Sequence, residues 1–153
     1  MIENISGKLV TLTPTMAVID NQGIGYGVEI SLQTYDALNG KGEASVYLQR
    51  QINPRDGVEV DYGFATKEER ELFRQITSVS GMGAASARMV LSSLSAEELR
   101  NAILSEDVGR LKGVKGIGLK TAQRLVLELK DKIVKGDGDG ADVLFRTDSG
   151  AAA

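Results

Sequence analysis

Apolar and polar residues alternate along residues 1–64, as they do in strands that bury one face. Strand-forming residues gather in short runs that are separated by turn signals such as Asn21-Gln22-Gly23 and Asn53-Pro54. The runs are residues 7–10, 16–20, 26–30, 44–48 and 58–62. Five short strands in this length predict a small closed β-barrel of the oligonucleotide-binding (OB) type, although the pattern does not fix the strand order and leaves a β-sandwich open.

From Thr66 onward the apolar residues follow a helical period instead. Thr66-Lys67-Glu68-Glu69 matches a capping box, and a second cap begins at Ser95. Helices are predicted after Thr66, over 84–94, after Ser95, over the short piece 107–112, and from Leu119. The stripe of the last helix is Leu119, Ala122, Leu125, Val126, Leu129 and Ile133. The fold class is therefore α+β, with an OB-fold barrel over 1–65 and a helical domain over 66–135.

The segment Gly116-Ile117-Gly118 stands directly before the last predicted helix. Two glycines around one apolar residue predict a tight hairpin in which Ile117 packs inward. The first N–H groups of a helix lack intrahelical partners, and the helix dipole favours an anion beside them. Lys120 and Arg124 lie four residues apart, so they share one face of that helix. Together these features predict a clamp for a phosphate backbone that reads no bases.

The same pattern occurs earlier, because residues 81–87 align with residues 116–122 and also lead into an apolar helix. Two aligned copies are typical of tandem helix-hairpin-helix motifs, which hold DNA phosphates without reading sequence. In the first copy Ala85 and Met89 replace the two cations, so we expect main-chain amides to dominate there, with Arg88 assisting. The residues predicted to contact DNA are Gly81, Met82, Gly83, Ala84, Arg88, Gly116, Ile117, Gly118, Leu119, Lys120, Thr121 and Arg124.

A nucleotide-binding P-loop is the nearest alternative for residues 113–121. That motif requires Lys directly after the last glycine and then Ser or Thr. Here Leu119 separates Gly118 from Lys120, and no buried strand precedes Gly113. The sequence therefore argues against an ATP site in this chain.

Composition removes several kinds of chemistry. The chain contains neither cysteine nor histidine, which excludes Ser-His and Cys-His nucleophile pairs and the usual zinc sites, and is compatible with a reducing cytosol. No apolar run approaches the ~20 residues of a membrane span, and the N-terminus lacks a signal-peptide pattern. We therefore expect a cytoplasmic protein without metal, cofactor or membrane partner.

Charge is distributed unevenly along the chain. The net charge is −3, yet residues 110–135 carry eight basic residues against two acidic ones. This local excess of six leaves the rest of the chain at −9. Such a polarised surface favours electrostatic steering of a polyanion toward the helical domain, although Lys130, Lys132 and Lys135 are read as a solvated helix face.

Residues 136–153 form a low-complexity ending. The spaced aspartates over 136–142 resemble a calcium loop, but Asp142 occupies the position of the required glycine and no glutamate closes the loop. A flexible acidic linker is the favoured interpretation.

Residues 1–135 resemble the RuvA family, the Holliday-junction-binding subunits of the bacterial branch-migration machinery. The resemblance rests on Gly23-Ile24-Gly25-Tyr26-Gly27-Val28, Tyr62-Gly63-Phe64, Glu69-Arg70, Leu72-Phe73, Gly116-Ile117-Gly118, Lys120-Thr121-Ala122, Arg124-Leu125 and Glu128-x-Lys130-Asp131. It implies a non-catalytic DNA-binding subunit that acts in recombination and repair.

The resemblance also implies partners. The barrels of a homotetramer would form a platform over an opened four-way junction, and paired tetramers around DNA are a family option. A RuvB-type hexameric ATPase would use the ATP, and a RuvC-type resolvase would act on the same junction. Family members add a C-terminal RuvB-binding domain, whereas this chain ends in the linker, so we expect a truncated form, a fragment, or a sequence whose remainder was lost.

An acidic pin at the platform centre is a further implication of the resemblance. By position the pin falls on Asp56 in Arg55-Asp56-Gly57, and Gly57 replaces the second acid of the family's pair. Glu59 and Asp61 are candidate helpers. Without the resemblance, Asp56 reads as an ordinary turn residue after Pro54.

Two other function classes stay open at this point. Repair nucleases and glycosylases also carry such hairpins, but they need a catalytic Asp or Lys in a base-accepting pocket, and the sequence shows no such arrangement. A protein-interaction module with apolar hairpins is the other alternative, which indifference to polyanions would favour.

Overall fold

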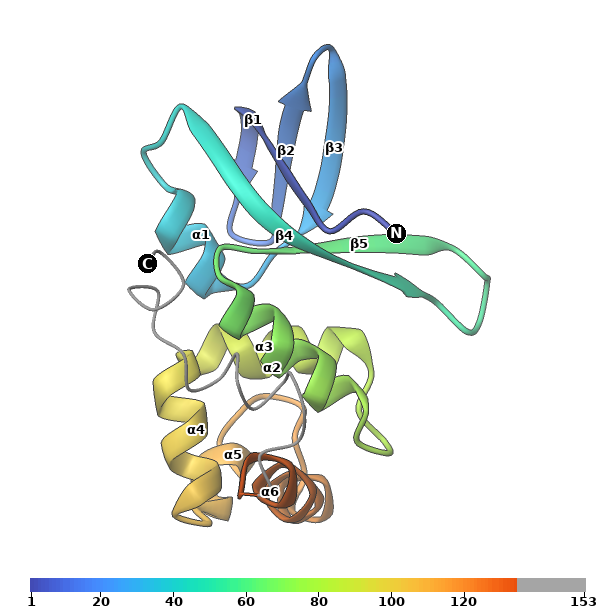
Figure 1. Cartoon of the computed structure of the whole chain (residues 1–153). Coiled ribbons are helices and arrows are strands. Elements are labelled where there is room, and N and C mark those ends of the chain that lie inside the picture. Colours follow the sequence, from blue (N-terminus) through green and yellow to red (C-terminus); the bar gives the residue numbers. More distant parts are fainter. Residues whose placement is uncertain (135–153) are drawn as a thin grey trace. The chain divides into compact units, whose positions relative to one another are not determined.

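A computed structural model describes residues 1–134, so the predicted linker over 136–153 lies outside the described residues. The chain divides into two units, Met1–Arg70 and a second that begins at Glu71. Figure 1 shows the β-strands in the first unit and a series of helices in the second.

Five strands close into a barrel in the first unit, which confirms the predicted barrel and excludes the sandwich. The strands are β1 (Asn4–Thr13), β2 (Met16–Asn21), β3 (Ile24–Glu29), β4 (Glu43–Ile52) and β5 (Glu59–Phe64). Around the barrel they follow the order β1-β2-β3-β5-β4. The β3–β5 pair is parallel, through Glu29 and Tyr62, and the other pairs are antiparallel.

The barrel core is built from the inward-facing residues of the alternating strands. Fully buried examples are Ile19, Val28, Val46 and Phe64. The sequence pattern did not predict α1 (Leu32–Leu38), a short helix between β3 and β4. Its seven residues are too few to show a helical period, and the N-cap Ser31, which accepts from the Thr34 amide at 3.2 Å, is its main sequence signal.

The first turn of α2 (Lys67–Thr77) departs from the predicted capping box. Thr66 Oγ1 accepts from the Glu69 amide at 3.1 Å, which is one half of the box. The Glu69 carboxylate is buried instead, and it accepts from Ser31 Oγ at 2.5 Å and Thr34 Oγ1 at 2.6 Å. The other half of the predicted box, in which the Glu69 carboxylate would accept from the Thr66 amide, is therefore wrong. The hydroxyls of Ser31 and Thr34 bind that carboxylate instead.

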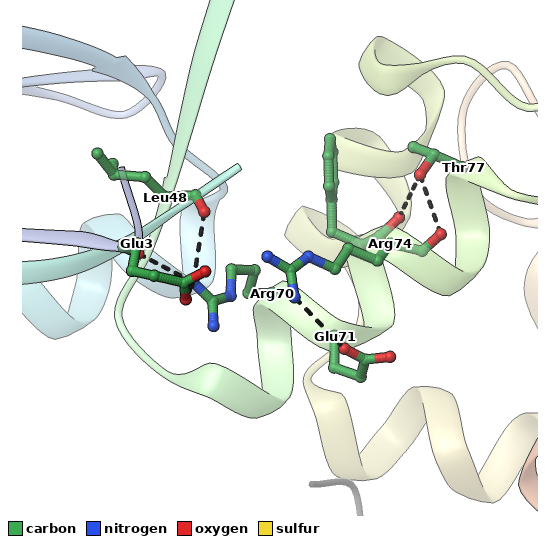
Figure 2. A network of polar contacts seen from close by, with 7 residues as sticks. Glu3, Leu48, Arg70, Glu71, Arg74 and Thr77 are labelled. Atoms are coloured by element: carbon green, nitrogen blue, oxygen red, sulfur yellow. Dashed lines mark hydrogen bonds and ion pairs between the residues drawn. The ribbon is translucent and has the colours of Figure 1, made fainter. Parts of the chain in front are cut away.

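Arg70 also fixes this turn of α2 to the barrel. Its Nη1 donates to the main-chain oxygen of Glu3 at 2.9 Å and to that of Leu48 at 3.4 Å, and it forms an ion pair with the Glu3 carboxylate at 3.1 Å. Figure 2 shows these contacts, and farther along α2 the Thr77 hydroxyl, which donates back to main-chain oxygens of its own helix.

Over residues 71–134, the described part of the second unit, the chain forms the rest of α2 and four further helices. These are α3 (Ala84–Ser93), α4 (Ala96–Leu104), α5 (Val108–Lys112) and α6 (Leu119–Val134). The capping box at the start of α4 is confirmed, since Ser95 and Glu98 bond reciprocally at 3.0 and 3.1 Å. The large buried side chains of the second unit come from all five of these helices: Leu72, Phe73, Ile76, Leu91, Leu99, Ile103, Leu111, Leu125 and Leu129.

Leu119 is a correction to the predicted apolar stripe of α6. Its side chain is 49 % exposed, whereas Ala122, Leu125 and the other members of the stripe are buried. Leu119 is the first residue of the helix and follows the exposed Gly118, so it lies before the packed part of α6 begins.

Candidate nucleic-acid interface

The two predicted hairpins have the same backbone geometry. Gly81 and Gly116 both adopt positive φ angles, +89° and +88°, a left-handed conformation that glycine takes without steric cost. In each hairpin the next amide closes the turn: Met82 N donates to Val79 O at 3.0 Å, and Ile117 N donates to Val114 O at 3.0 Å. The sequence repeat is therefore also a structural repeat.

Each hairpin is held by the apolar residue between its glycines. Met82 is 7 % exposed and Ile117 is 6 % exposed, so both side chains are buried as the pattern predicted for Ile117. The glycines on either side are exposed. The buried side chains and turn-closing amides of Met82 and Ile117 consequently fix the shape of each turn, while the glycines on either side expose their main chain.

Both hairpins lead into helices whose first amides have no partner. In α3 the first helical bond is Ala87 N to Gly83 O at 3.0 Å, and in α6 it is Ala122 N to Gly118 O at 2.9 Å. The N–H groups between them donate to no protein group within residues 1–134; they belong to Ala84, Ala85, Ser86, Leu119, Lys120 and Thr121. Ala84, Ser86 and Thr121 are half-buried, and the others are exposed. The result is two matched sets of main-chain donors.

The two predicted cations of α6 have different surroundings. Lys120 is exposed and has no ion-pair or hydrogen-bond partner for its side chain among residues 1–134. Arg124 Nη1 instead donates to Ser80 O at 3.2 Å, in the first hairpin. Sequence reasoning placed Arg124 at the second hairpin and missed this contact, because a main-chain acceptor leaves no signature in the sequence.

Two other cations of residues 110–135 contact neighbours within the second unit. Lys130 forms an ion pair with Glu106 at 2.8 Å, and Lys132 donates to Ser78 Oγ. Arg88, the predicted assistant of the first hairpin, is half-buried in α3. Lys120 and Arg124 are exposed beside the hairpins, as are Lys112 and Lys115.

The predicted pin residue Asp56 lies in the exposed loop between β4 and β5. Its Oδ1 accepts from the Val58 amide at 2.9 Å, the geometry of an Asx turn. Gly57 adopts φ +72°, and its amide donates to Asn53 O at 2.8 Å. The left-handed backbone at Gly57 explains why glycine suits the place where the family pattern has a second acid.

The two candidate helpers of the pin are paired with one arginine. Arg50 contacts Glu59 at 3.1 Å and Asp61 at 2.9 Å across the β4–β5 pair. Their negative charge is offset locally, whereas Asp56 has no ion pair within residues 1–134. Asp56 is therefore the stronger pin candidate of the three.

Comparison with known proteins adds independent evidence. Residues 1–55 match the model described as RuvA N terminal domain, and residues 73–131 match the SAM-like helix-hairpin-helix tandem. A Bacteroides fragilis protein, "Holliday junction branch migration complex subunit RuvA", is 54% identical over 136 residues, which are 89% of this chain and 67% of that protein. The chain belongs to the RuvA family.

Two further RuvA relatives extend the likeness. The protein of the same name from Porphyromonas gingivalis is 46% identical over 153 residues, covering 100% of this chain and 75% of its own length. That from Neisseria meningitidis is 48% identical over 134 residues, 88% of this chain and 69% of its own length. The resemblance to the RuvA family is thus confirmed over both units, and the second model match contains both hairpins.

No helix within residues 1–134 is both long and apolar enough to cross a membrane. The same residues hold no group of three or more Asp or Glu side chains placed to bind a metal ion.

Proposed function

We propose that this RuvA-family chain is a non-catalytic subunit that binds four-way DNA junctions independently of sequence. The observation that carries the proposal is the pair of equivalent hairpins, each with a left-handed glycine and unpartnered main-chain amides. Phosphate oxygens accept hydrogen bonds from such amides, and these contacts carry no base information. Recombination and repair are the processes in which such junctions arise.

The charge distribution supports the helical unit as the phosphate-binding part. Residues 1–64 carry four basic and eight acidic residues, so the barrel disfavours close phosphate contact. The basic excess over 110–135 includes the exposed Lys120 and Arg124. The barrel is better suited to a platform that carries the Asp56 pin than to the oligonucleotide binding seen in other OB folds.

The assembly around the junction is also proposed. The printed names of the relatives describe a subunit of a branch migration complex. We infer a homotetramer whose barrels form the platform, with Asp56 repeated near its centre. A RuvB-type ATPase would supply ATP-driven movement and a RuvC-type resolvase the cleavage, in the cytoplasm, while this chain binds no cofactor.

Substitution of both hairpin cations tests the DNA-binding proposal. The double variant Lys120→Ala with Arg124→Ala should weaken binding to a synthetic four-way junction, and the slope of log K against log salt should shrink by roughly 2. Lys130→Ala is the matched control, because Lys130 lies on the same helix but pairs with Glu106. Its slope should stay near that of the wild type.

An unchanged slope in the double variant would refute the hairpin clamp. The same junction, and a nicked duplex, should also remain intact when the protein is incubated with Mg²⁺. Cleavage under these conditions would favour a nuclease instead of a binding subunit.

A further inference from the structure

Arg124 belongs to the helix that follows the second hairpin, yet its side chain contacts the first. Its Nη1 donates to Ser80 O at 3.2 Å. The same atom lies 3.9 Å from the place that a Cβ on Gly81 would occupy. Ser80, Gly81 and Arg124 are all exposed, so this contact lies at the surface where a phosphate would meet the turn.

We propose that Arg124 is a positioning residue for the first hairpin and supplies a cation there, which α3 does not offer at the places equivalent to Lys120 and Arg124. The proposal rests on the proposed DNA-binding function and refines it. Arg124 would hold the Ser80–Gly81 turn in the shape that presents its amides, and its charge would attract the phosphate bound there. The two hairpins would then share the cations of a single helix, α6.

The sequence repeat shows why the first hairpin needs this contribution. Lys120 and Arg124 of α6 correspond to Ala85 and Met89 of α3, so α3 offers no cation at either place. The arrangement is therefore one-sided: α6 contributes a side-chain donor to the first hairpin, whereas the side chain of the corresponding Met89 has no N–H to donate to the second.

A second contact from α6 supports the same assignment. Lys132 donates to Ser78 Oγ, two residues before Ser80, so α6 contacts the approach to the first hairpin at two points. Arg124 also keeps donors for a ligand. A guanidinium has five N–H donors in a planar fork, and the contact with Ser80 uses one of its nitrogens. Arg124 can thus bind Ser80 O and a phosphate together.

Amide hydrogen exchange of the DNA-free protein tests the positioning role. The Met82 amide closes the first hairpin and the Ile117 amide closes the second, both at 3.0 Å, so the repeat supplies an internal reference. In Arg124→Ala the Met82 amide should exchange about three- to tenfold faster, with Ile117 unchanged. In the matched variant Lys120→Ala, which removes an unpaired cation of the same helix, neither amide should change.

Junction binding by Arg124→Lys separates position from charge. Lysine keeps the positive charge, so the salt slope should match the wild type. Lysine lacks the planar fork, so affinity should be about threefold lower than that of the wild type at every salt concentration. The Met82 amide should exchange as fast as it does in Arg124→Ala. Equal acceleration of Met82 and Ile117, no acceleration in Arg124→Ala, or wild-type affinity and exchange in Arg124→Lys would each overturn the proposal.

The two proposals fail in distinguishable ways. A wild-type protein that does not bind junctions would refute the proposed function, while the exchange of Met82 would still decide whether Arg124 shapes the first hairpin. Unchanged exchange combined with a reduced salt slope would refute the positioning role alone.

Discussion

Gly81 and Gly116 occupy equivalent places in the two hairpins and share a left-handed backbone, with φ values of +89° and +88°. A Cβ at Gly116 would meet nothing within 4 Å, and one at Gly81 would meet only the Arg124 side chain, at 3.9 Å. The requirement for glycine is therefore one of backbone conformation rather than of space. The turn depends on it because these φ values place the exposed amides.

Gly116→Ala should destabilise the chain by about 1–2 kcal/mol, the cost of a left-handed conformation for an L residue. Gly81→Ala should cost a similar amount, and both should weaken junction binding. Urea unfolding followed by circular dichroism measures the change in stability. Gly42→Ala is the matched control, since Gly42 has open space around it and no positive φ. A neutral Gly116→Ala would mean that the turn tolerates a different backbone.

Asp56→Asn should leave junction binding nearly intact and reduce strand separation at the crossover. Asparagine retains the Oδ1 that accepts from the Val58 amide, so the loop keeps its shape while one exposed negative charge is lost. Affinity should rise by no more than about twofold, because exposed charges are screened by salt. Fluorescence of a base analogue at the crossover measures the separation.

Asp20→Asn is a close control for this experiment. Asp20 Oδ1 accepts from the Gly23 amide, three residues on, at 2.9 Å, so it too bonds a main-chain amide of its own turn, in the β2–β3 hairpin. It loses the same charge away from the candidate pin. Equal fluorescence changes in the two variants would contradict a specific pin role for Asp56.

Glu69→Gln should change how the stability of the barrel unit depends on pH. Burial raises the pKa of the Glu69 carboxyl above its ordinary value of 4.5, although the hydroxyls of Ser31 and Thr34 act in the opposite direction. The folded state thus binds this proton more tightly than the unfolded state does. The contribution is fully present below the unfolded pKa and is lost as pH rises through the raised folded pKa.

The stability of the wild type relative to Glu69→Gln should therefore fall as pH rises above 4.5. Urea unfolding of both proteins at several pH values from weakly acidic to neutral measures this difference. A difference that grows in favour of the wild type would show that hydrogen bonding to the carboxylate outweighs its burial.

Much of the fold could be predicted because its signals are local. Strand alternation predicted the barrel, and the cap at Ser95 predicted the start of α4. The role of Glu69 could not be predicted, because its partners Ser31 and Thr34 lie more than 30 residues away in an unpredicted part of the chain. Leu119 fits the apolar period, but burial also depends on whether neighbouring elements extend over a helix end.

The hairpins were predictable for the same reason, since a repeated glycine pattern is a local signal with a backbone meaning. The contact between Arg124 and Ser80 was not, because the two residues are 44 positions apart and the acceptor is a main-chain oxygen. The helical spacing correctly grouped Lys120 with Arg124 on α6. It could not show that a long side chain reaches the other hairpin.

The side chains of Met82 and Ile117 are buried, so the exposed edge of each hairpin, its rim, consists largely of peptide groups. If that rim holds a duplex, each successive nucleotide offers it the same partner, whatever base is attached. The energy of the complex would then be nearly uniform along the DNA. Strands could advance past the protein in single-nucleotide steps without pausing at favoured sequences, which suits a guide for moving DNA.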